Sequence, residues 1–382
     1  MRTPDLNWIK DPRVFQVNRL QAYSDHIYTI GKDKKPSSFS LNGTWKFNTT
    51  KNYDSCFKFF YNTEFNDSNW NDIQVPGHIQ LQGFDNPHYT DVTYPWDGHD
   101  VVKPGQIDMD KNKVYQYRKT FDCPQDFIGN KLILSFEGAE SNIYVWLNGK
   151  FIGYAEDSFT PSRFDITKYT QEKDNVLCVR IFQKCTGTWL EDQDMWRFTG
   201  IFRDVMIYKQ PSLHIQDLKI DTDIDLDTNK SVLSCVCKMS SNESHTLQAK
   251  LYDPQGNIVW NGNMQDTFEI PVENTCLWSS EFPNLYQLEL VLYDTNNEII
   301  ETIQEQVGFR KFTLEYGIMK LNGKRIVFHG INRHEWDPKT GRCLSQEQME
   351  EDIHILKSLN INAVRTSHYP NNSYWYKLCD QY

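Results

Sequence analysis

The chain has 382 residues, more than one ordinary domain needs and typical of two or three domains. Apolar residues make up 39 % and charged residues 24 %, and no low-complexity tract interrupts the sequence, so the composition excludes a mainly disordered protein. The 40 Lys and Arg residues against 51 Asp and Glu give a net charge of −11. This acidic balance, with no basic run, argues against nucleic-acid and anionic-membrane partners and favours a small neutral ligand.

Two features of the sequence bear on where the protein works. No uncharged run approaches the roughly 18–20 residues that a membrane-spanning helix needs, and residues 1–20 show no apolar stretch like that of a signal peptide. The nine Cys residues are scattered and form no CxxC pair. Cys235 and Cys237 are expected on one face of a strand, where they cannot easily bridge each other. We therefore expect reduced thiols, a cytoplasmic location and no membrane partner.

Residues 39–210 carry the pattern of a β-sandwich, after an N-terminal extension of residues 1–38. Along residues 142–147 aliphatic and aromatic side chains alternate, and Asn148-Gly149 then supplies the positive φ angles of a tight hairpin. The same alternation recurs in the segments 131–140 and 175–182. Short strands at this spacing predict a jelly-roll domain.

Residues 211–309 form a second predicted all-β domain. The expected hairpins lie at residues 231–239, 245–262 and 285–302, with turns at residues 253–256 and 294–297. About a hundred residues of this kind are typical of an immunoglobulin-like β-sandwich. The Cys–Trp–Cys signature of antibody domains is missing from this stretch of sequence, so the prediction concerns the architecture alone.

The pattern changes to α/β in residues 310–382. An apolar strand is predicted at 324–332 and a buried strand at 361–370, each followed by a helix, at 345–360 and at 372–382. The first helix shows a capping box (Ser345, Gln348) and a stripe of Met349, Ile353, Leu356 and Leu359, and the second a side formed by Trp375, Leu378 and Cys379. Two parallel strands cannot close a barrel or cover their own apolar faces. We therefore expect the first two units of an incomplete barrel, completed by a longer polypeptide or a partner chain; the alternative is a small terminal subdomain.

Two histidines and an arginine come from neighbouring strand ends in this region. His334, and then Arg365 and His368, are expected just past the carboxyl ends of consecutive parallel strands, where barrel enzymes place their active sites. Neutral imidazole can hydrogen-bond sugar hydroxyls, and Arg can hold a carboxylate in a bidentate pair. No Ser or Cys is spaced to act as a nucleophile here. The pattern indicates a ligand site, with purely structural histidines as the alternative.

Three acids, Glu191, Asp192 and Asp194, lie among aromatic residues in one segment. Acids in such surroundings cost desolvation energy unless they are paired or bind a cation. One interpretation is that Arg197 and Arg203 neutralise the three acids in an interdomain salt-bridge network. The other is that the carboxylates are presented to a polyhydroxylated ligand or a hard cation.

A second segment, residues 88–100, has a similar mixture on a predicted loop, with Asp91, Tyr94 and Trp96. The flat faces of Tyr and Trp suit the apolar face of a pyranose ring. This segment therefore adds to the prediction of a sugar ligand.

Four sequence motifs together resemble glycoside hydrolase family 2, of the β-galactosidase type. They are LNGTWKF (41–47), LEDQDMWR with GIFRD (190–204), GINRHE (330–335) and NAVRTSHYP (362–370). The resemblance implies a jelly-roll sugar-binding domain, an immunoglobulin-like domain and a (β/α)8 TIM barrel cut within the barrel, which here starts at residue 310. It also implies retaining hydrolysis of terminal non-reducing β-D-galactose residues, as in lactose.

The resemblance carries roles onto matching residues. His334 and His368 match the two histidines that stabilise the transition state, and Arg365 matches the arginine that orients the nucleophile. Asp194 matches the acid that binds galactosyl hydroxyls and a sodium ion. Asp91 stands where many members have Asn and is a further expected substrate contact.

In the family both catalytic Glu residues, and the Mg²⁺ site beside them, lie on later barrel strands. The resemblance therefore implies that this chain is inactive alone and that Mg²⁺ and Na⁺ belong to the complete enzyme, which is a homo-oligomer or is completed by a second chain. Two alternatives stay open. One is a non-catalytic sugar-binding or scaffold subunit completed in trans, and the other is another family 2 activity such as β-glucuronidase.

Overall fold

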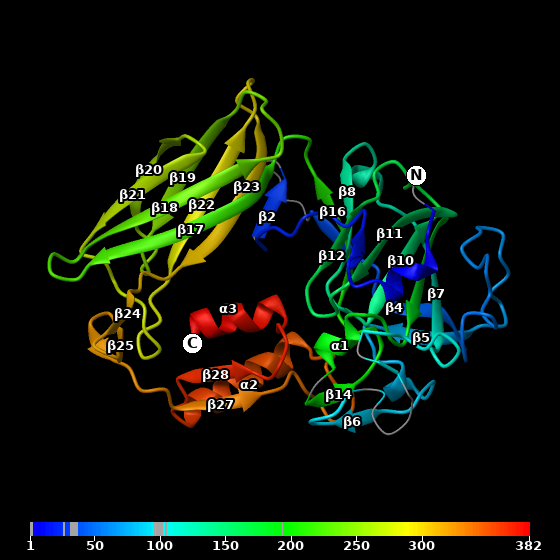
Figure 1. Cartoon of the computed structure of the whole chain (residues 1–382). Coiled ribbons are helices and arrows are strands. Elements are labelled where there is room, and N and C mark those ends of the chain that lie inside the picture. The colour runs from blue at the N-terminus through cyan, green and yellow to red at the C-terminus, as the bar shows by residue number, and fades with distance from the viewer. Residues whose placement is uncertain are drawn as a thin grey trace.

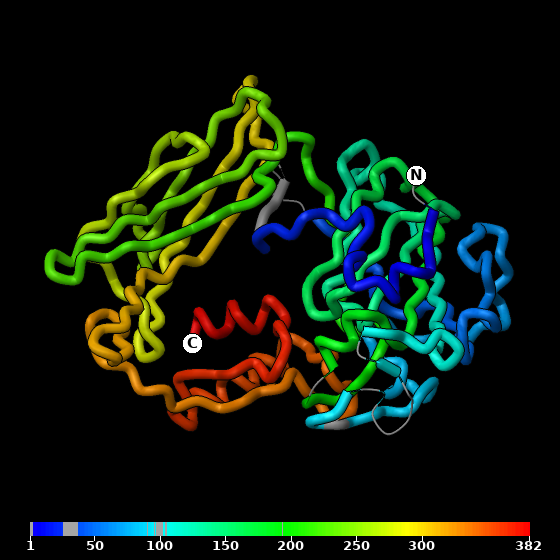
Figure 2. Tube along the Cα trace, viewed as in Figure 1, coloured from blue at the N-terminus to red at the C-terminus, as the bar shows by residue number. Residues whose placement is uncertain are grey.

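The computed structural model describes residues 3–25, 27–30, 37–94, 96, 102–103, 105–192 and 194–382. They form two β-sandwiches and a C-terminal α/β segment, with the first sandwich on the right of Figure 1, the second at the upper left, and the C-terminal segment along the bottom. The trace in Figure 2 shows the C-terminal segment running from the second sandwich back to the first. This arrangement confirms the predicted fold class of two sandwiches followed by the start of a barrel.

The first sandwich packs a seven-stranded sheet against a four-stranded sheet. The larger sheet has the order β1 (Gln16–Val17), β11 (Lys150–Glu156), β10 (Asn142–Leu147), β13 (Asn175–Phe182), β7 (Val114–Phe121), β4 (Gly43–Thr50), β5 (Asn71–Val75). The smaller sheet has the order β12 (Ser162–Asp165), β8 (Lys131–Phe136), β16 (Val205–Gln210), β3 (Ser38–Ser40). All their pairings are antiparallel.

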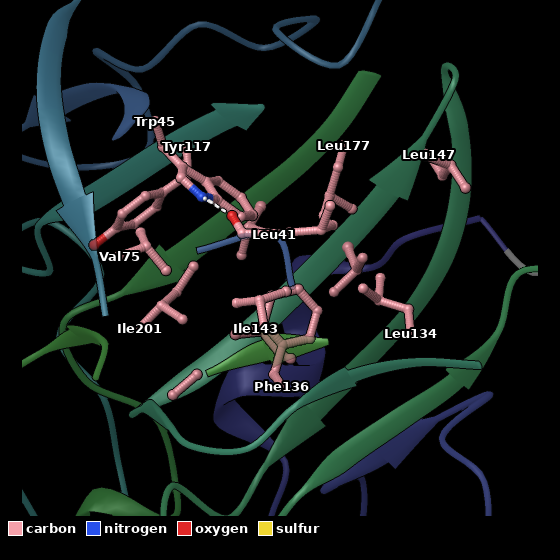
Figure 3. Close-up of a cluster of buried hydrophobic side chains, with 14 of the residues drawn as sticks. Leu41, Trp45, Val75, Tyr117, Leu134, Phe136, Ile143, Leu147, Leu177 and Ile201 are labelled. Atoms are coloured by element: carbon pink, nitrogen blue, oxygen red, sulfur yellow. Dashed lines mark hydrogen bonds between the residues drawn. The ribbon is translucent and has the colours of Figure 1, made fainter. Parts of the chain in front are cut away.

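Every residue of β10 is buried, because both faces of its sheet are covered. The aliphatic side chains, such as Ile143 and Leu147, enter the core between the sheets, which Figure 3 shows together with Trp45 and its hydrogen bond to the Leu41 carbonyl oxygen. The alternating aromatic side chains face the other way. They join a second core with residues of η1 (Leu6–Lys10) and of the segment 53–70. Much of the aromatic excess of the sequence therefore stabilises this sandwich, since each large ring buries 150–250 Å² or so, about the largest area of any side chain.

The predicted hairpin between β10 and β11 is confirmed. Asn148 and Gly149 have φ angles of 50° and 75°, which match the twist of the two strands they join. The Asn42-Gly43 turn differs, since β3 before it and β4 after it belong to different sheets. It carries the chain from one layer of the sandwich to the other.

The second sandwich consists of a three-stranded and a five-stranded sheet. Their orders are β17 (Ile215–Asp225), β18 (Lys230–Met239), β21 (Thr267–Glu273), and β2 (Ile27–Ile30), β23 (Ile299–Val307), β22 (Tyr286–Tyr293), β19 (Thr246–Tyr252), β20 (Ile258–Met264). The N-terminal extension thus adds β1 to the first sandwich and β2 to the second. Cys235 and Cys237 lie buried on one face of β18, and all nine cysteines are free thiols.

The C-terminal segment begins with a three-stranded sheet of β24 (Phe312–Glu315), β25 (Ile318–Leu321) and β26 (Lys324–Arg325). Next come β27 (Gly330–Arg333), α2 (Gln346–Ser358), β28 (Ala363–Thr366) and α3 (Ser373–Gln381). Strands β27 and β28 pair in parallel, and the capping box of Ser345 and Gln348 starts α2. The two helices pack together through a small core of Met349, Ile353, Leu356, Trp375 and Leu378.

Three details of this segment differ from prediction. The predicted strand 324–332 is two short strands, because β26 turns back to pair antiparallel with β25 before β27 begins. The predicted buried strand is only half-buried in β28, and three of the four residues of β27 are exposed, since within the described residues no third strand joins this pair. Leu359 is 65 % exposed, because it caps α2 rather than continuing its apolar stripe.

The remaining short elements are η2 (Gln80–Gln82), η3 (Gln125–Phe127), α1 (Thr188–Glu191) and the two-stranded ribbons β6 (His88–Thr90) with β14 (Met195–Arg197) and β9 (Ala139–Glu140) with β15 (Gly200–Ile201). Across the described residues no helix combines the length and the apolar character that crossing a membrane demands. The ribbon of β6 and β14 lies beside the C-terminal segment in Figure 1.

The exposed parallel pair makes a testable difference in local stability. We expect amide hydrogens of β27 and β28 to exchange at least about tenfold faster than those of β10 and β13, because their hydrogen bonds are close to solvent and lie outside a large core. Hydrogen–deuterium exchange measured by mass spectrometry on the 382-residue chain checks this. Equal protection in the two pairs of strands would contradict it.

Candidate active site

Strands β27 and β28 bring two histidines together at their carboxyl ends. The parallel register pairs Arg333 with Thr366, so His334 follows the end of one strand and His368 lies two residues beyond the other. The two imidazole centroids are 5.8 Å apart and their planes are nearly perpendicular. The hydroxyl oxygen of Tyr369 lies 3.5 Å from Nδ1 of His334. Local strand geometry thus brings together one half of the candidate site.

The other half comes from the first sandwich through Asp194. This residue precedes β14 and has a φ of 52°, a left-handed conformation that a short polar side chain tolerates. Its Oδ2 lies 3.1 Å from Nε2 of His368, and its Oδ1 accepts a hydrogen bond from the hydroxyl of Tyr89 at 3.3 Å. Asp194 is therefore held between β6 on its own side and the barrel segment opposite, with 54 % of its side chain exposed.

Asp91 adjoins this arrangement through its backbone, whereas the contact described for the Arg365 side chain is with Ser367. The Asp91 carbonyl oxygen accepts a hydrogen bond from the Asp194 amide at 3.0 Å, while its own carboxylate accepts one from the amide of Val92. Asp91 is thus next to Asp194 through its backbone and exposes its side chain. Arg365 lies within β28 rather than beyond its end, and its Nη1 is 3.5 Å from the Ser367 hydroxyl.

The three acids of the segment 190–194 have separate environments, so neither interpretation holds for all of them. The Glu191 carboxylate accepts hydrogen bonds from the amide and hydroxyl of Ser158, at 3.0 and 2.7 Å, and burial raises the pKa of Glu191 to about 7. Asp192 is also buried, and Arg197 donates to its carbonyl oxygen at 2.9 Å. Of the three, only Asp194 has an exposed carboxylate, with 54 % of its side chain accessible.

The predicted interdomain salt bridge exists, but with a different partner. Arg203 pairs with Glu335 at 2.8 Å and not with the acids of its own segment. The same guanidinium donates to the Pro370 carbonyl oxygen at 2.8 Å and to the Phe159 carbonyl oxygen at 2.7 Å. Because Glu335 follows His334 directly, this buried pair ties the histidine-bearing segment to the first sandwich.

The aromatic prediction needs a correction. Trp96 is 2 % exposed and stacks on Trp189 with centroids 4.3 Å apart, so no face of it is open to a sugar. Residue 95 and residues 97–100 of that loop lie outside the described residues. A cavity of about 550 Å³ beside His334 is lined instead by four other rings, those of Tyr89, Trp196, Trp336 and Tyr369.

Sequence reasoning missed Tyr89, Trp336 and Tyr369, although two of them gave a signal. Trp336 stands two residues after His334, and Tyr369 directly follows His368. Side chains this close to a strand end meet the same edge of the sheet. Tyr89 had no such signal, because its contact with Asp194 depends on the pairing of β6 with β14.

The charges around His334 favour its neutral form. Its pKa lies below the ordinary value of 6.5, first because it is partly buried, and then because positive charge on His368 and Arg342 opposes protonation. Asp194 acts in the opposite direction. A neutral imidazole keeps one nitrogen as a hydrogen-bond acceptor and one as a donor, so it can both donate to and accept from hydroxyl groups.

The fit of the site to a metal ion is limited. Among the residues that the structure describes, no group of three or more His, Cys, Asp or Glu side chains is placed to hold one. Asp194 offers a half-exposed carboxylate, the kind of oxygen ligand that hard cations take. Asp194 therefore offers one carboxylate as a partial ligand at this point.

All three parts of the chain match models of a single family. Residues 39–211 match the model described as glycosyl hydrolases family 2, sugar binding domain, residues 213–310 the model described as glycosyl hydrolases family 2, and residues 312–382 that of its TIM barrel domain.

Two relatives are informative. A β-galactosidase of Halalkalibacterium halodurans is 48 % identical over 391 residues, covering 99 % of this chain and 39 % of that protein. A β-galactosidase large subunit of Leuconostoc lactis is 41 % identical over 399 residues, covering 99 % of this chain and 64 % of that protein. The chain thus spans about two fifths of the first relative and less than two thirds of the second.

Among solved structures, a β-glucuronidase of Bacteroides uniformis superposes with a TM-score of 0.74. It is 22 % identical and covers 90 % of this chain and 41 % of that chain. At this identity the likeness concerns the fold alone.

Glu191 makes the stability of the site region depend on pH in a defined direction. Because the folded-state pKa of about 7 lies above the ordinary 4.5, the folded chain holds an extra proton between these values. Its contribution to stability is full below pH 4.5 and is lost as the pH rises through 7. We expect the free energy of unfolding of the wild type, relative to Glu191→Gln, to fall by roughly 1–3 kcal/mol between pH 4.5 and 7.5.

Urea unfolding at several pH values measures this difference. The matched control is Glu273→Gln, which changes an exposed glutamate of β21. A difference between wild type and Glu191→Gln that is flat or rises with pH would contradict the assignment.

Proposed function

Since the chain belongs to glycoside hydrolase family 2, we propose that it is the amino-terminal part of a retaining β-galactosidase and supplies one wall of its substrate site. The observation that carries the proposal is the contact between Asp194 and His368, which joins the sugar-binding domain to the barrel segment. Tyr89, which contacts Asp194, and Tyr369, which follows His368, line the neighbouring cavity. The names of the relatives favour β-galactosidase over other activities of the family.

His334 and His368 would serve the reaction as hydrogen-bond partners of galactosyl hydroxyls. Their rings stand nearly perpendicular, so they address different hydroxyl groups of one sugar. A contact that tightens as the sugar ring flattens toward an oxocarbenium ion stabilises the transition state more than the ground state. One preorganised donor of this kind can contribute about 3 kcal/mol.

Asp194 would accept hydrogen bonds from the same sugar. The Tyr89 hydroxyl on one carboxylate oxygen and the His368 imidazole on the other fix its orientation before ligand binds, which lowers the entropic cost of binding. Its carboxylate also suits a sodium ion, for which residues outside this chain would provide the other ligands. Asp91 would lie at the rim of the site and contact substrate through an exposed carboxylate.

Hydrolysis with retention needs two carboxyl groups roughly 5–5.5 Å apart, one as nucleophile and one as acid and base. We propose that both, together with a Mg²⁺ site beside them, belong to barrel strands outside these 382 residues, which the exposed pair β27 and β28 would join. Arg365, on β28, would hold the nucleophile ionised. The chain would then bind sugar without turning it over.

How the barrel is completed has two candidate answers. The rest could follow in the same polypeptide of a homo-oligomer, or a second polypeptide could supply it. Relatives named β-galactosidase large subunit show that proteins similar to this chain are named as parts of a multi-chain enzyme. A cytoplasmic location fits the nine free thiols and is part of the same proposal.

The first test is a pair of measurements on the 382-residue chain. We expect no hydrolysis of a chromogenic β-galactoside above a buffer blank, together with weak galactose binding, in the millimolar range, that Asp194→Ala weakens markedly. Isothermal titration calorimetry measures the binding, and Asp204→Ala, outside the site, is the matched control. Turnover by the pure chain would contradict the proposal that both catalytic carboxyl groups lie outside these 382 residues. Galactose binding that Asp194→Ala leaves unchanged would contradict the proposed role of Asp194 in the site.

The second test concerns the enzyme with a completed barrel. We expect His368→Ala to lower kcat by about 100-fold and to raise KM much less, because its contact would strengthen in the transition state. Steady-state kinetics on a chromogenic galactoside distinguish the two constants. A large rise in KM with kcat unchanged would reassign His368 to ground-state binding.

A further inference from the structure

Arg342 is the most enclosed cation near the site, and nothing in the reaction proposed above uses it. Its side chain is 1 % exposed, and it comes from the loop between β27 and α2. Gly341 before it has a φ of 63°, and a Cβ atom there would come within 2.8 Å of the His78 ring. The loop can therefore approach the first sandwich closely enough for Arg342 to enter it.

The Arg342 guanidinium makes its polar contacts inside the first sandwich. Nη1 donates to the Trp196 carbonyl oxygen at 2.7 Å, and Nη2 pairs with Oε2 of Glu140 on β9. The Arg342 amide donates to Nε2 of His78 at 3.0 Å, so the His78 imidazole is the acceptor there. The planar guanidinium therefore binds two fixed acceptors at once, the Trp196 carbonyl oxygen and the Glu140 carboxylate. A lysine ammonium has no such planar pair of donors.

The partners of Arg342 are neighbours of the site residues in the chain. Trp196 is two residues from Asp194 on the sandwich side. On the barrel side the guanidinium carbon lies 5.4 Å from the centroid of Tyr369, the residue that follows His368. The Tyr369 hydroxyl in turn lies 3.5 Å from Nδ1 of His334. Arg342 therefore reaches His334 and His368 through Tyr369, and it reaches the segment that carries Asp194 through Trp196.

We propose that Arg342 is a positioning residue of this site, which fastens β14 to the segment after β28 and so holds Asp194 against His368. Arg342 also lines the cavity beside His334, but its side chain is 1 % exposed, so we expect it to act on the site through its neighbours. A role of Arg342 in catalysis rests on the proposed function. Its effect on the contact between Asp194 and His368 can be tested without any sugar. Removing the Arg342 guanidinium would leave the buried Glu140 carboxylate without its partner. We therefore expect the substitution to disturb the neighbouring segments as well as its own contacts.

An alternative is that Arg342 only stabilises the interface, as Arg203 does through Glu335. The two roles differ in what they predict for a folded variant. Removing a residue that only stabilises the interface lowers the free energy of unfolding and leaves the site unchanged. Removing a positioning residue also changes the contact between Asp194 and His368. The electrostatic environment gives a second signature, because charge on Arg342 contributes to the lowered pKa of His334.

The test uses the 382-residue chain with ¹³C-labelled histidine. In the wild-type background, Asp194→Asn should shift the His368 imidazole resonances strongly, since the pair lies 3.1 Å apart. In the Arg342→Met background the same Asn substitution should have at most about a third of that effect, because the contact is no longer held. The His334 titration should also move toward the ordinary value in Arg342→Met and stay low in Arg342→Lys, which keeps the charge.

Arg118→Met is the matched control. Arg118 is also a buried arginine, but it pairs with Asp67 within the first sandwich and not with a residue of the barrel segment. It should leave the response of His368 unchanged. If Arg342→Met does not fold, Glu140→Gln releases one arm of the guanidinium and should give the same loss in part. A full response of His368 in a folded Arg342 or Glu140 variant, or an equal loss in Arg118→Met, would overturn the proposal.

Discussion

The contact between Asp194 and His368 is the constraint on which the candidate site depends. The two residues stand 174 positions apart and belong to different domains, yet their side chains lie 3.1 Å apart. Neither domain alone can set that distance. It follows from the parallel register of β27 and β28 on one side, and from the left-handed backbone of Asp194 ahead of β14 on the other. Buried contacts between the domains hold β14 next to the pair of β27 and β28.

Two buried ion pairs are among those crossing contacts. Arg203 reaches from the sandwich to Glu335, and Arg342 reaches back from the barrel segment to Glu140, so each side contributes one cation and one anion. Buried pairs are costly to desolvate and are weak evidence for stability. They do fix geometry, because a guanidinium fork accepts few orientations. The interface is thus suited to holding two halves of a site in register.

Much of the fold could be predicted from local sequence, because its signals are local. Asn148-Gly149 dictates a hairpin, and Ser345 with Gln348 dictates the start of a helix. The errors arose where pairing partners decide the outcome. Residues 324–332 are apolar enough for one long strand, but β26 pairs with β25 and ends early. The site divides in the same way: the histidines follow from strand ends, whereas Tyr89 and Arg342 enter only through tertiary contacts.

The most direct measurement is a double-mutant cycle for galactose binding with Asp194→Asn, His368→Gln and the double variant. If the two side chains act as one unit, the double variant should lose little more affinity than either single variant, with a coupling free energy of about 1 kcal/mol or more. Additive losses within about 0.3 kcal/mol would show that they act independently and would contradict a shared site.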